Sequence, residues 1–185
     1  VALGATVEDM SYEDFEWLMG INFWGVVHGT KAFLPHLKAA GEGHIVNVSS
    51  VFGLIGVPTQ SAYNASKFAV RGFTEALRQE LEMEGGRVSC TSVHPGGIKT
   101  NIARNARMGA GVEKITGDVD KARRDFEKMF RTTPEEASQT ILKGVKGNKR
   151  RVLIGSDARA IDSMQRLMPT AYQRIMVAGQ KMMRK

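Results

Sequence analysis

Cysteine is almost absent from this chain, whose 185 residues contain a single Cys, at position 90. One thiol cannot form an internal disulfide, so the fold has to rest on packing, as expected for a reducing, cytoplasmic setting. Cys90 lies in the run RVSCTSVHP, and its apolar neighbours favour a buried structural thiol over a nucleophile. The Cys and His residues also lack the spacing of a zinc site, so no metal is expected.

Long apolar runs are missing as well. No stretch approaches the roughly 18 residues that a membrane-spanning helix needs. The opening residues, VALGATVEDM, have neither the basic nor the apolar region of a signal peptide. With 42% hydrophobic and 24% charged residues, the chain can bury one substantial core, which predicts a single domain over residues 1–185.

Acidic residues are scarce in the second half of the chain. Residues 1–100 carry 7 Lys or Arg and 10 Asp or Glu, a net charge of −3, whereas residues 101–185 carry 19 and 9, a net charge of +10. Solvated helix faces explain such an excess, and the lack of interleaved aromatic residues argues against nucleic-acid binding. Residues 171–185 are expected to form a short amphipathic helix, which self-packing suits better than contact with an anionic membrane surface.

Helical and strand patterns alternate along the chain. Ser11 begins a helical pattern that continues to about Leu37, with Asp14 placed to complete a capping box. Buried strands are predicted at Ile45–Val48, Val88–Val93 and Arg151–Ile154. Further helices are predicted from Ser61 to about Glu84, from Pro134 to about Lys146 after the cap Thr133, and after the cap Asp157. The alternation predicts an α/β fold with a parallel sheet, helices on both faces and right-handed crossovers.

The stretch from His44 to Glu82 carries the candidate chemistry. Ser50 lies just past a predicted strand, and Tyr63 and Lys67 are separated by four residues, which places them one turn apart on one helix face. A Tyr ordinarily has a pKa of about 10, and a nearby ammonium favours its phenolate. Lys67 is therefore expected to lower the pKa of Tyr63. A Tyr–Lys pair alone is more often a surface contact, so the surrounding pattern decides.

That pattern resembles a known family. The strings NVSS and YNASKFA, with thirteen residues from Ser50 to Tyr63, are similar to the signature of the short-chain dehydrogenases/reductases. The resemblance covers nearly the whole chain and implies a Rossmann-like, doubly wound parallel sheet. It implies hydride transfer between NAD or NADP and a secondary alcohol or ketone, with Tyr63 as general acid/base. By the same resemblance, Ser50 stabilises the reacting oxygen and Lys67 also holds the ribose hydroxyls of the cofactor.

Asn22 is a further candidate that the resemblance supplies. With Gly25 and Pro35 in the family's spacing, Asn22 is expected at a local helix distortion, where it holds a water of the proton relay. The alternative is an Asn that satisfies backbone groups in a bent helix.

The resemblance also implies a cofactor contact after the second predicted strand. The break at Pro95 and Gly96 would let the backbone approach a ligand closely. The main chain at Ile98 would face the nicotinamide carboxamide, and the Thr100 hydroxyl would reach the cofactor's amide or phosphate. The irregular residues 101–119 and a short helix to about residue 130 lie where the family has its variable substrate lid.

Several side chains near these positions suggest the character of the substrate site. An apolar lining is expected from Phe52, Leu54, Ile55, Val57 and Met108. Arg104 and Arg107 leave room for an acidic group. Core and surface roles remain open for the same residues.

The glycine-rich turn that takes the cofactor's pyrophosphate is absent from this sequence. The family's pattern would place it before Val1, so the chain is expected to correspond to the carboxyl-terminal two thirds of such an enzyme, with the amino-terminal strands missing. The choice between NAD and NADP stays open. A homodimer or homotetramer is expected. The alternative function is a non-catalytic binding or interaction protein that keeps the fold.

Overall fold

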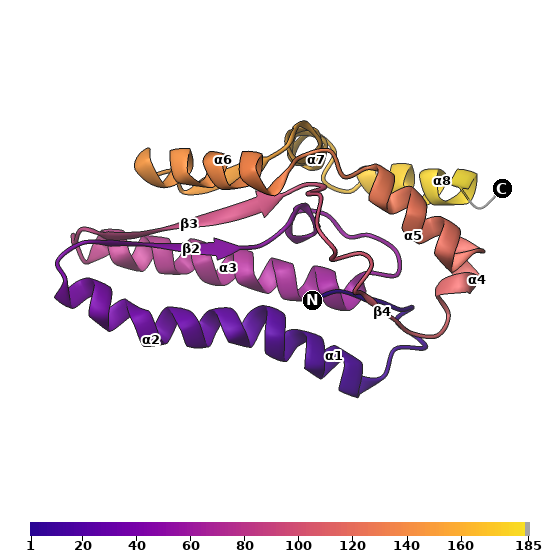
Figure 1. Cartoon of the computed structure of the whole chain (residues 1–185), viewed down its shortest axis with the longest axis horizontal. Helices are drawn as coiled ribbons and strands as arrows, with labels where there is room; N and C mark the ends of the chain where they lie inside the picture. The colour runs from indigo at the N-terminus through magenta and orange to yellow at the C-terminus, as the bar shows by residue number, and fades with distance from the viewer. Residues whose placement is uncertain (184–185) are drawn as a thin grey trace.

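A computed structural model describes residues 1–183 of the chain (Figure 1). Its main sheet has three parallel strands in the order β2 (Gly43–Val48), β3 (Val88–Pro95) and β5 (Arg151–Ile154). Val48 is paired with Val93, and Val93 with Val152, so the carboxyl ends of the strands meet at one edge. The α/β fold with a parallel sheet is confirmed, and its strands lie where the β-branched runs predicted them.

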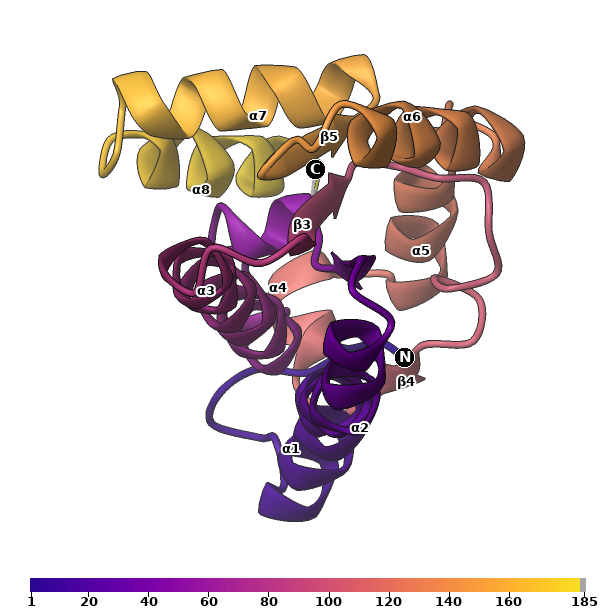
Figure 2. The same cartoon turned by 90° about the vertical axis from the view of Figure 1, so that its left-hand side faces the viewer.

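Helices cover both faces of this sheet (Figures 1 and 2). Helices α2 (Gly25–Ala39) and α3 (Ser61–Met83) pack on the face that holds Ile45 and Cys90. Helix α6 (Pro134–Lys146) packs on the opposite face, against Val46 and Val93. Because neighbouring strand residues point to opposite faces, this alternation places α3 and α6 on opposite sides.

The position of α6 corrects one expectation about connectivity. The chain steps in one direction across the sheet, from β2 to β3 and on to β5. The first crossover runs through α3 and the second through α6, on opposite faces. Two steps in one direction on opposite faces have opposite hands, so the prediction that all crossovers are right-handed is wrong.

The first helix is interrupted by a wider turn. Helix α1 (Tyr12–Met19) continues through a π-helical segment, Gly20–Trp24, into α2. Ser11 caps α1 by accepting a hydrogen bond from the Asp14 amide at 3.1 Å. The Asp14 carboxylate does not complete a capping box, because it accepts a hydrogen bond from Arg107 at 3.1 Å.

The second half of the chain contains more structure than its glycines suggested. Within residues 101–119, β4 (Arg107–Met108) pairs in parallel with β1 (Leu3–Gly4), and α4 (Val112–Thr116) follows. Helix α5 spans Val119–Lys128. Thr133 and Glu136 form the predicted capping box of α6. The chain continues through α7 (Ser156–Leu167) to α8 (Tyr172–Met183). Helix α8 begins one residue after the predicted start at 171, and residues 184–185 of the predicted helix lie outside the described part.

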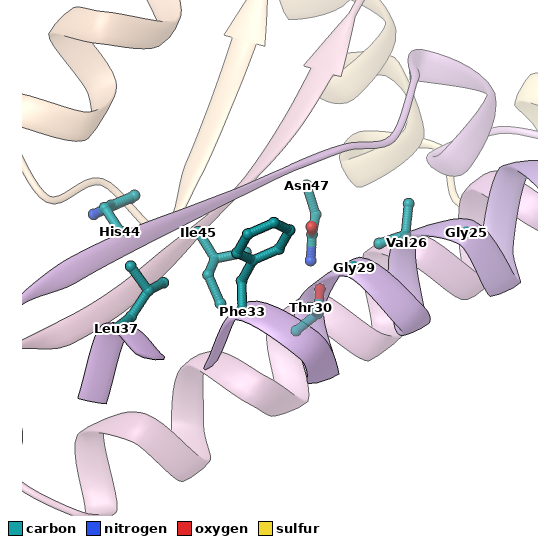
Figure 3. A pocket seen from close by; sticks show the side chains of 9 residues that line it. All are labelled: Gly25, Val26, Gly29, Thr30, Phe33, Leu37, His44, Ile45 and Asn47. Atoms are coloured by element: carbon teal, nitrogen blue, oxygen red, sulfur yellow. The ribbon is translucent and has the colours of Figure 1, made fainter. Parts of the chain in front are cut away.

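A groove of about 330 Å³ lies between α2 and β2 (Figure 3). Gly25 and Gly29 leave it open along α2, and Phe33 stands over it. The hydroxyl of Thr30 is buried there without a hydrogen-bond partner among the described residues. None of the predicted site residues lines this groove, so the candidate chemistry lies elsewhere.

Candidate active site

Ser50, Tyr63 and Lys67 come together at the carboxyl end of β2. Ser50 caps a short 3-10 helix, Val51–Gly53, and its hydroxyl oxygen accepts a hydrogen bond from the Phe52 amide at 3.1 Å. Tyr63 and Lys67 occupy the first turns of α3, and the Ser50 side chain lies near enough to Tyr63 to lower the pKa of the phenol. The Lys67 ammonium lies 5.6 Å from the centre of the Tyr63 ring. Ser50, Tyr63 and Lys67, which the sequence spacing predicted to lie together, therefore form one compact group.

Burial controls the pKa of Tyr63. The side chain is 9% exposed and packs against Leu3, Leu18 and Phe52. This desolvation raises the pKa of Tyr63 above its ordinary value, and the neighbouring polar side chain of Ser50 offsets part of the rise. The expected lowering by Lys67 is therefore wrong for this structure, because loss of water outweighs the favourable contacts.

Lys67 is held in place by a main-chain oxygen. Its ammonium donates to the carbonyl of Val48, the last residue of β2, at 3.1 Å. Burial lowers the pKa of Lys67 to about 8, so the ammonium is the main form at neutral pH and is lost a little above it.

A buried histidine that the sequence analysis missed fixes Ser50. His94 is fully buried on β3, and its Nδ1 lies 3.0 Å from the Ser50 carbonyl oxygen. Since a carbonyl only accepts, Nδ1 carries the proton and Nε2 accepts from the Ser92 hydroxyl at 3.0 Å. Burial lowers the pKa of His94 to about 4, which keeps the ring neutral at working pH. The sequence did contain one sign of this role, because His94 is a polar residue within the apolar strand β3.

Asn64 ties the Ser50 loop to the helix of Tyr63. Its side-chain amide donates to the carbonyls of Phe52 at 2.7 Å and Ile55 at 2.8 Å. Its oxygen accepts from the Val57 amide at 3.0 Å. Three bonds to one loop from the residue after Tyr63 set the distance between Ser50 and Tyr63.

Gly53 allows the loop to lie directly on α3. A Cβ at this position would overlap the Ser49 hydroxyl and lie 2.7 Å from the Lys67 carbonyl oxygen. The Ser49 hydroxyl donates to that same carbonyl at 2.7 Å. The backbone of the loop and the backbone that carries Lys67 are therefore in contact, and only glycine fits between them.

Asn22 lies in the π-helical segment, so the expected helix distortion is present. The side chain is 6% exposed. Its amide donates to the Val1 carbonyl at 2.9 Å and to the Ser66 hydroxyl at 3.4 Å. Ser66 in turn donates to the Tyr63 carbonyl at 2.8 Å, which links Asn22 to the helix of Tyr63.

The turn after β3 is shaped by α7. A Cβ on Gly96 would overlap the Asp157 carboxylate, which accepts a hydrogen bond from the Gly97 amide at 2.6 Å. Asp157 therefore supports this turn, and the prediction that it caps α7 is wrong, because Gly155 holds the cap position. A ligand was expected to approach the backbone closely at Gly96. On the side where a Cβ would lie, the group that approaches is the Asp157 carboxylate of the protein itself.

Ile98 and Thr100 follow Pro95 on the same turn. The Thr100 amide donates to the Ile98 carbonyl at 2.8 Å, and the exposed Thr100 hydroxyl lies 3.5 Å from the Ile102 amide. Among the described residues, no group accepts a hydrogen bond from the Ile98 amide. This amide is free to donate to a ligand.

Other residues expected around the substrate have different roles. Leu54 and Ile55 are each 2% exposed and belong to the core, so they do not line an open site. Arg104 pairs with Glu127 at 3.3 Å, and Arg107 pairs with Asp14 and lies over the Trp17 ring at 3.5 Å. Both arginines are engaged within the protein, which removes the support for an acidic substrate group.

Residues 1–183 offer neither a metal site nor a membrane-spanning helix. This part of the chain has no cluster of three or more His, Cys, Asp or Glu that could bind a metal ion. None of its helices is both long and apolar enough to cross a membrane.

A parallel sheet with Ser, Tyr and Lys at its carboxyl edge defines the class of protein as a Rossmann-like oxidoreductase. The comparisons agree with this class. A family model described as short chain dehydrogenase matches residues 2–111. The protein SadH of Mycobacterium tuberculosis is 50% identical over 179 residues, which cover 97% of this chain and 63% of SadH.

Solved structures give the same result. A short-chain dehydrogenase/reductase from Burkholderia phymatum in complex with NAD superposes with a TM-score of 0.75 at 27% identity, covering 90% of this chain and 62% of that one. One from Burkholderia cenocepacia in complex with NADP has a TM-score of 0.72 at 25% identity, covering 95% and 65%. The chain belongs to the short-chain dehydrogenase family, and it spans less than two thirds of the length of these relatives.

Proposed function

We propose that this chain is the catalytic part of an NAD- or NADP-dependent oxidoreductase that interconverts a secondary alcohol and a ketone. The observation that carries the proposal is the grouping of Ser50 and Tyr63 at the end of β2, with the Lys67 ammonium 5.6 Å from the centre of the tyrosine ring. These three groups supply a proton, a hydrogen bond to the reacting oxygen and a fixed positive charge.

Tyr63 is the proton donor when a ketone is reduced. Its raised pKa keeps the phenol protonated at neutral pH, and that form can pass a proton to a carbonyl oxygen as hydride reaches the carbonyl carbon. In alcohol oxidation the phenolate takes the proton back. Ser50 donates its hydroxyl hydrogen to the same oxygen, because its own oxygen already accepts from the Phe52 amide.

The residues fit the nicotinamide end of the cofactor. The free Ile98 amide suits the carboxamide oxygen, and the Lys67 ammonium suits the ribose hydroxyls. The cofactor supplies the hydride when bound. Relatives solved with NAD and with NADP support either dinucleotide.

Assembly into a homodimer or homotetramer remains part of the proposal. Ile21 and Trp24 are 47% and 51% exposed, and Phe68 on α3 is 41% exposed. Such large apolar side chains on neighbouring helices favour contact with a second copy. Light scattering at micromolar concentration tests this, and a monomer would contradict it.

Isotope transfer tests the function itself. The full-length protein is incubated with NADH or NADPH that carries deuterium at C4 on either face, together with acetone or acetophenone. We expect deuterium at the carbinol carbon of the product, detected by mass spectrometry. Tight cofactor binding with no deuterium in any alcohol would favour the alternative, a non-catalytic protein with this fold.

A further inference from the structure

A row of aromatic rings extends outward from Tyr63. The Phe52 ring meets the Tyr63 ring edge to face, with centres 5.9 Å apart and an angle of 82°. Phe126 on α5 lies 6.2 Å from Phe52, and Phe130 lies 5.0 Å from Phe126. The row therefore joins the proposed proton donor to helix α5, which lies more than 50 residues further along the chain.

Helix α5 is only lightly anchored. It has no buried residue, and Phe126 is 36% exposed, in contrast to 9% for Tyr63. Beyond the aromatic row, its attachments include the exposed Arg104–Glu127 pair. A helix with so little buried surface is displaced at low cost, whereas the groups beneath Tyr63 are core. A substrate that reaches Tyr63 can therefore make room most easily on the α5 side.

The environment on that side is apolar. Two of the cationic side chains that flank Phe126 face carboxylates of α5 itself, Arg123 with Asp120 at 3.9 Å and Lys128 with Asp125 at 2.8 Å. On the side of Tyr63 that faces α5, the Phe52 ring lies against the Tyr63 ring and the Phe126 ring lies against Phe52. A substrate substituent that lies between Tyr63 and α5 takes the place of contacts between aromatic rings. An aryl or similarly bulky apolar group replaces those contacts best.

We infer that Phe52 and Phe126 form the wall that receives the larger substituent of the substrate, which belongs to the aryl or bulky apolar ketones and secondary alcohols. The inference rests on the proposed function, since it takes Ser50 and Tyr63 as the position of the reacting oxygen. Phe126 is a specificity-determining residue in this arrangement.

The test measures kcat/KM of the full-length enzyme for acetophenone and for acetone, in the wild type and three variants. Phe126→Ala removes the outer ring of the wall. Phe126→Leu keeps apolar bulk without the ring. Met129→Ala is the matched control, because it truncates a 54% exposed apolar side chain just past the end of α5, outside the aromatic row. Thermal unfolding of each variant checks that the fold is kept.

We expect the wild type to prefer acetophenone. Phe126→Ala should reduce kcat/KM for acetophenone about tenfold and change that for acetone less than about twofold, since only the bulky substituent loses its contact. Phe126→Leu should lie between, and Met129→Ala should match the wild type.

The outcomes separate the inference from the function beneath it. Turnover of acetone that equals or exceeds that of acetophenone would overturn the aromatic wall while the oxidoreductase function stands. Equal losses for both ketones in Phe126→Ala, or the same loss in Met129→Ala, would overturn the assigned role of Phe126. No turnover of either ketone would contradict the proposed function and the inference together.

Discussion

The residues around Ser50 and helix α5 differ in how firmly they are held. We call the contacts that fix Ser50 and the loop after it the frame. Ser50 is fixed through His94, the loop after it is fixed through Asn64, and Gly53 brings that loop into backbone contact with α3. Helix α5, by contrast, has no buried residue and meets this frame through Phe126. The difference indicates that the proton-transfer geometry is rigid, while the side from which a substrate enters can adapt.

The largest loss of stability is expected when the close contact between Gly53 and α3 is forced apart. Gly53→Ala places a methyl group against Ser49 and the Lys67 carbonyl, and we expect it to lower the free energy of unfolding by more than about 2 kcal/mol. Denaturant unfolding measures the change. Gly72→Ala on the exposed side of α3 is the control, because no atom lies within 4 Å of its new methyl group, and it should stabilise by about 0.5–1 kcal/mol. Equal stability of both variants would refute the tight contact.

Loss of the histidine should reduce turnover without moving the cofactor. His94→Leu leaves the Ser50 carbonyl without its donor, and we expect kcat to fall about tenfold while the dissociation constant of the cofactor stays within twofold. His94→Gln can still donate from its amide, so it should recover part of the rate. An equal loss in both variants would indicate that His94 matters only for packing.

The pH dependence of the reduction sharpens the role of Lys67. With a pKa of about 8, the folded protein loses this ammonium above pH 8, earlier than an exposed lysine would. We therefore expect the rate of ketone reduction to fall with rising pH around 8. In Lys67→Arg the cation persists, so this alkaline fall should move upward by at least one pH unit. An unshifted profile would assign the fall to another group.

The smallest effect is expected on the outer side of the site. Tyr172 on α8 is 7% exposed and accepts a hydrogen bond from the Gly56 amide at 3.0 Å. Tyr172→Phe removes this bond and should destabilise the protein by about 1 kcal/mol, a decrease in Tm of roughly 2–4 °C. Tyr12→Phe, at an 89% exposed position, should leave Tm unchanged. A Tyr172→Phe variant with wild-type Tm would show that α8 does not brace this loop.

The same contrast explains what the sequence could predict. Strands and capped helices follow local rules, so β2, β3, β5 and the capping box at Thr133 were found from their patterns. Ser50, Tyr63 and Lys67 were found through a family signature, and their spacing placed the last two on one helix face.

The partners of these residues were not predictable because they depend on contacts between distant segments. His94 reaches Ser50 across 44 positions, and Asp157 reaches Gly97 across 60. The raised pKa of Tyr63 likewise results from burial by Leu3 and Leu18, which no local pattern reports. Residues that look like caps or core in the sequence take on supporting roles only in the folded protein.

The most direct test of the central assignment is the turnover of Tyr63→Phe in the full-length enzyme. The variant loses only the hydroxyl that exchanges the proton, so we expect the rate of ketone reduction to fall by at least about a hundredfold, with cofactor affinity and thermal stability close to those of the wild type. A Tyr63→Phe enzyme that keeps more than about a tenth of the wild-type rate would contradict the role of Tyr63 as the acid/base group.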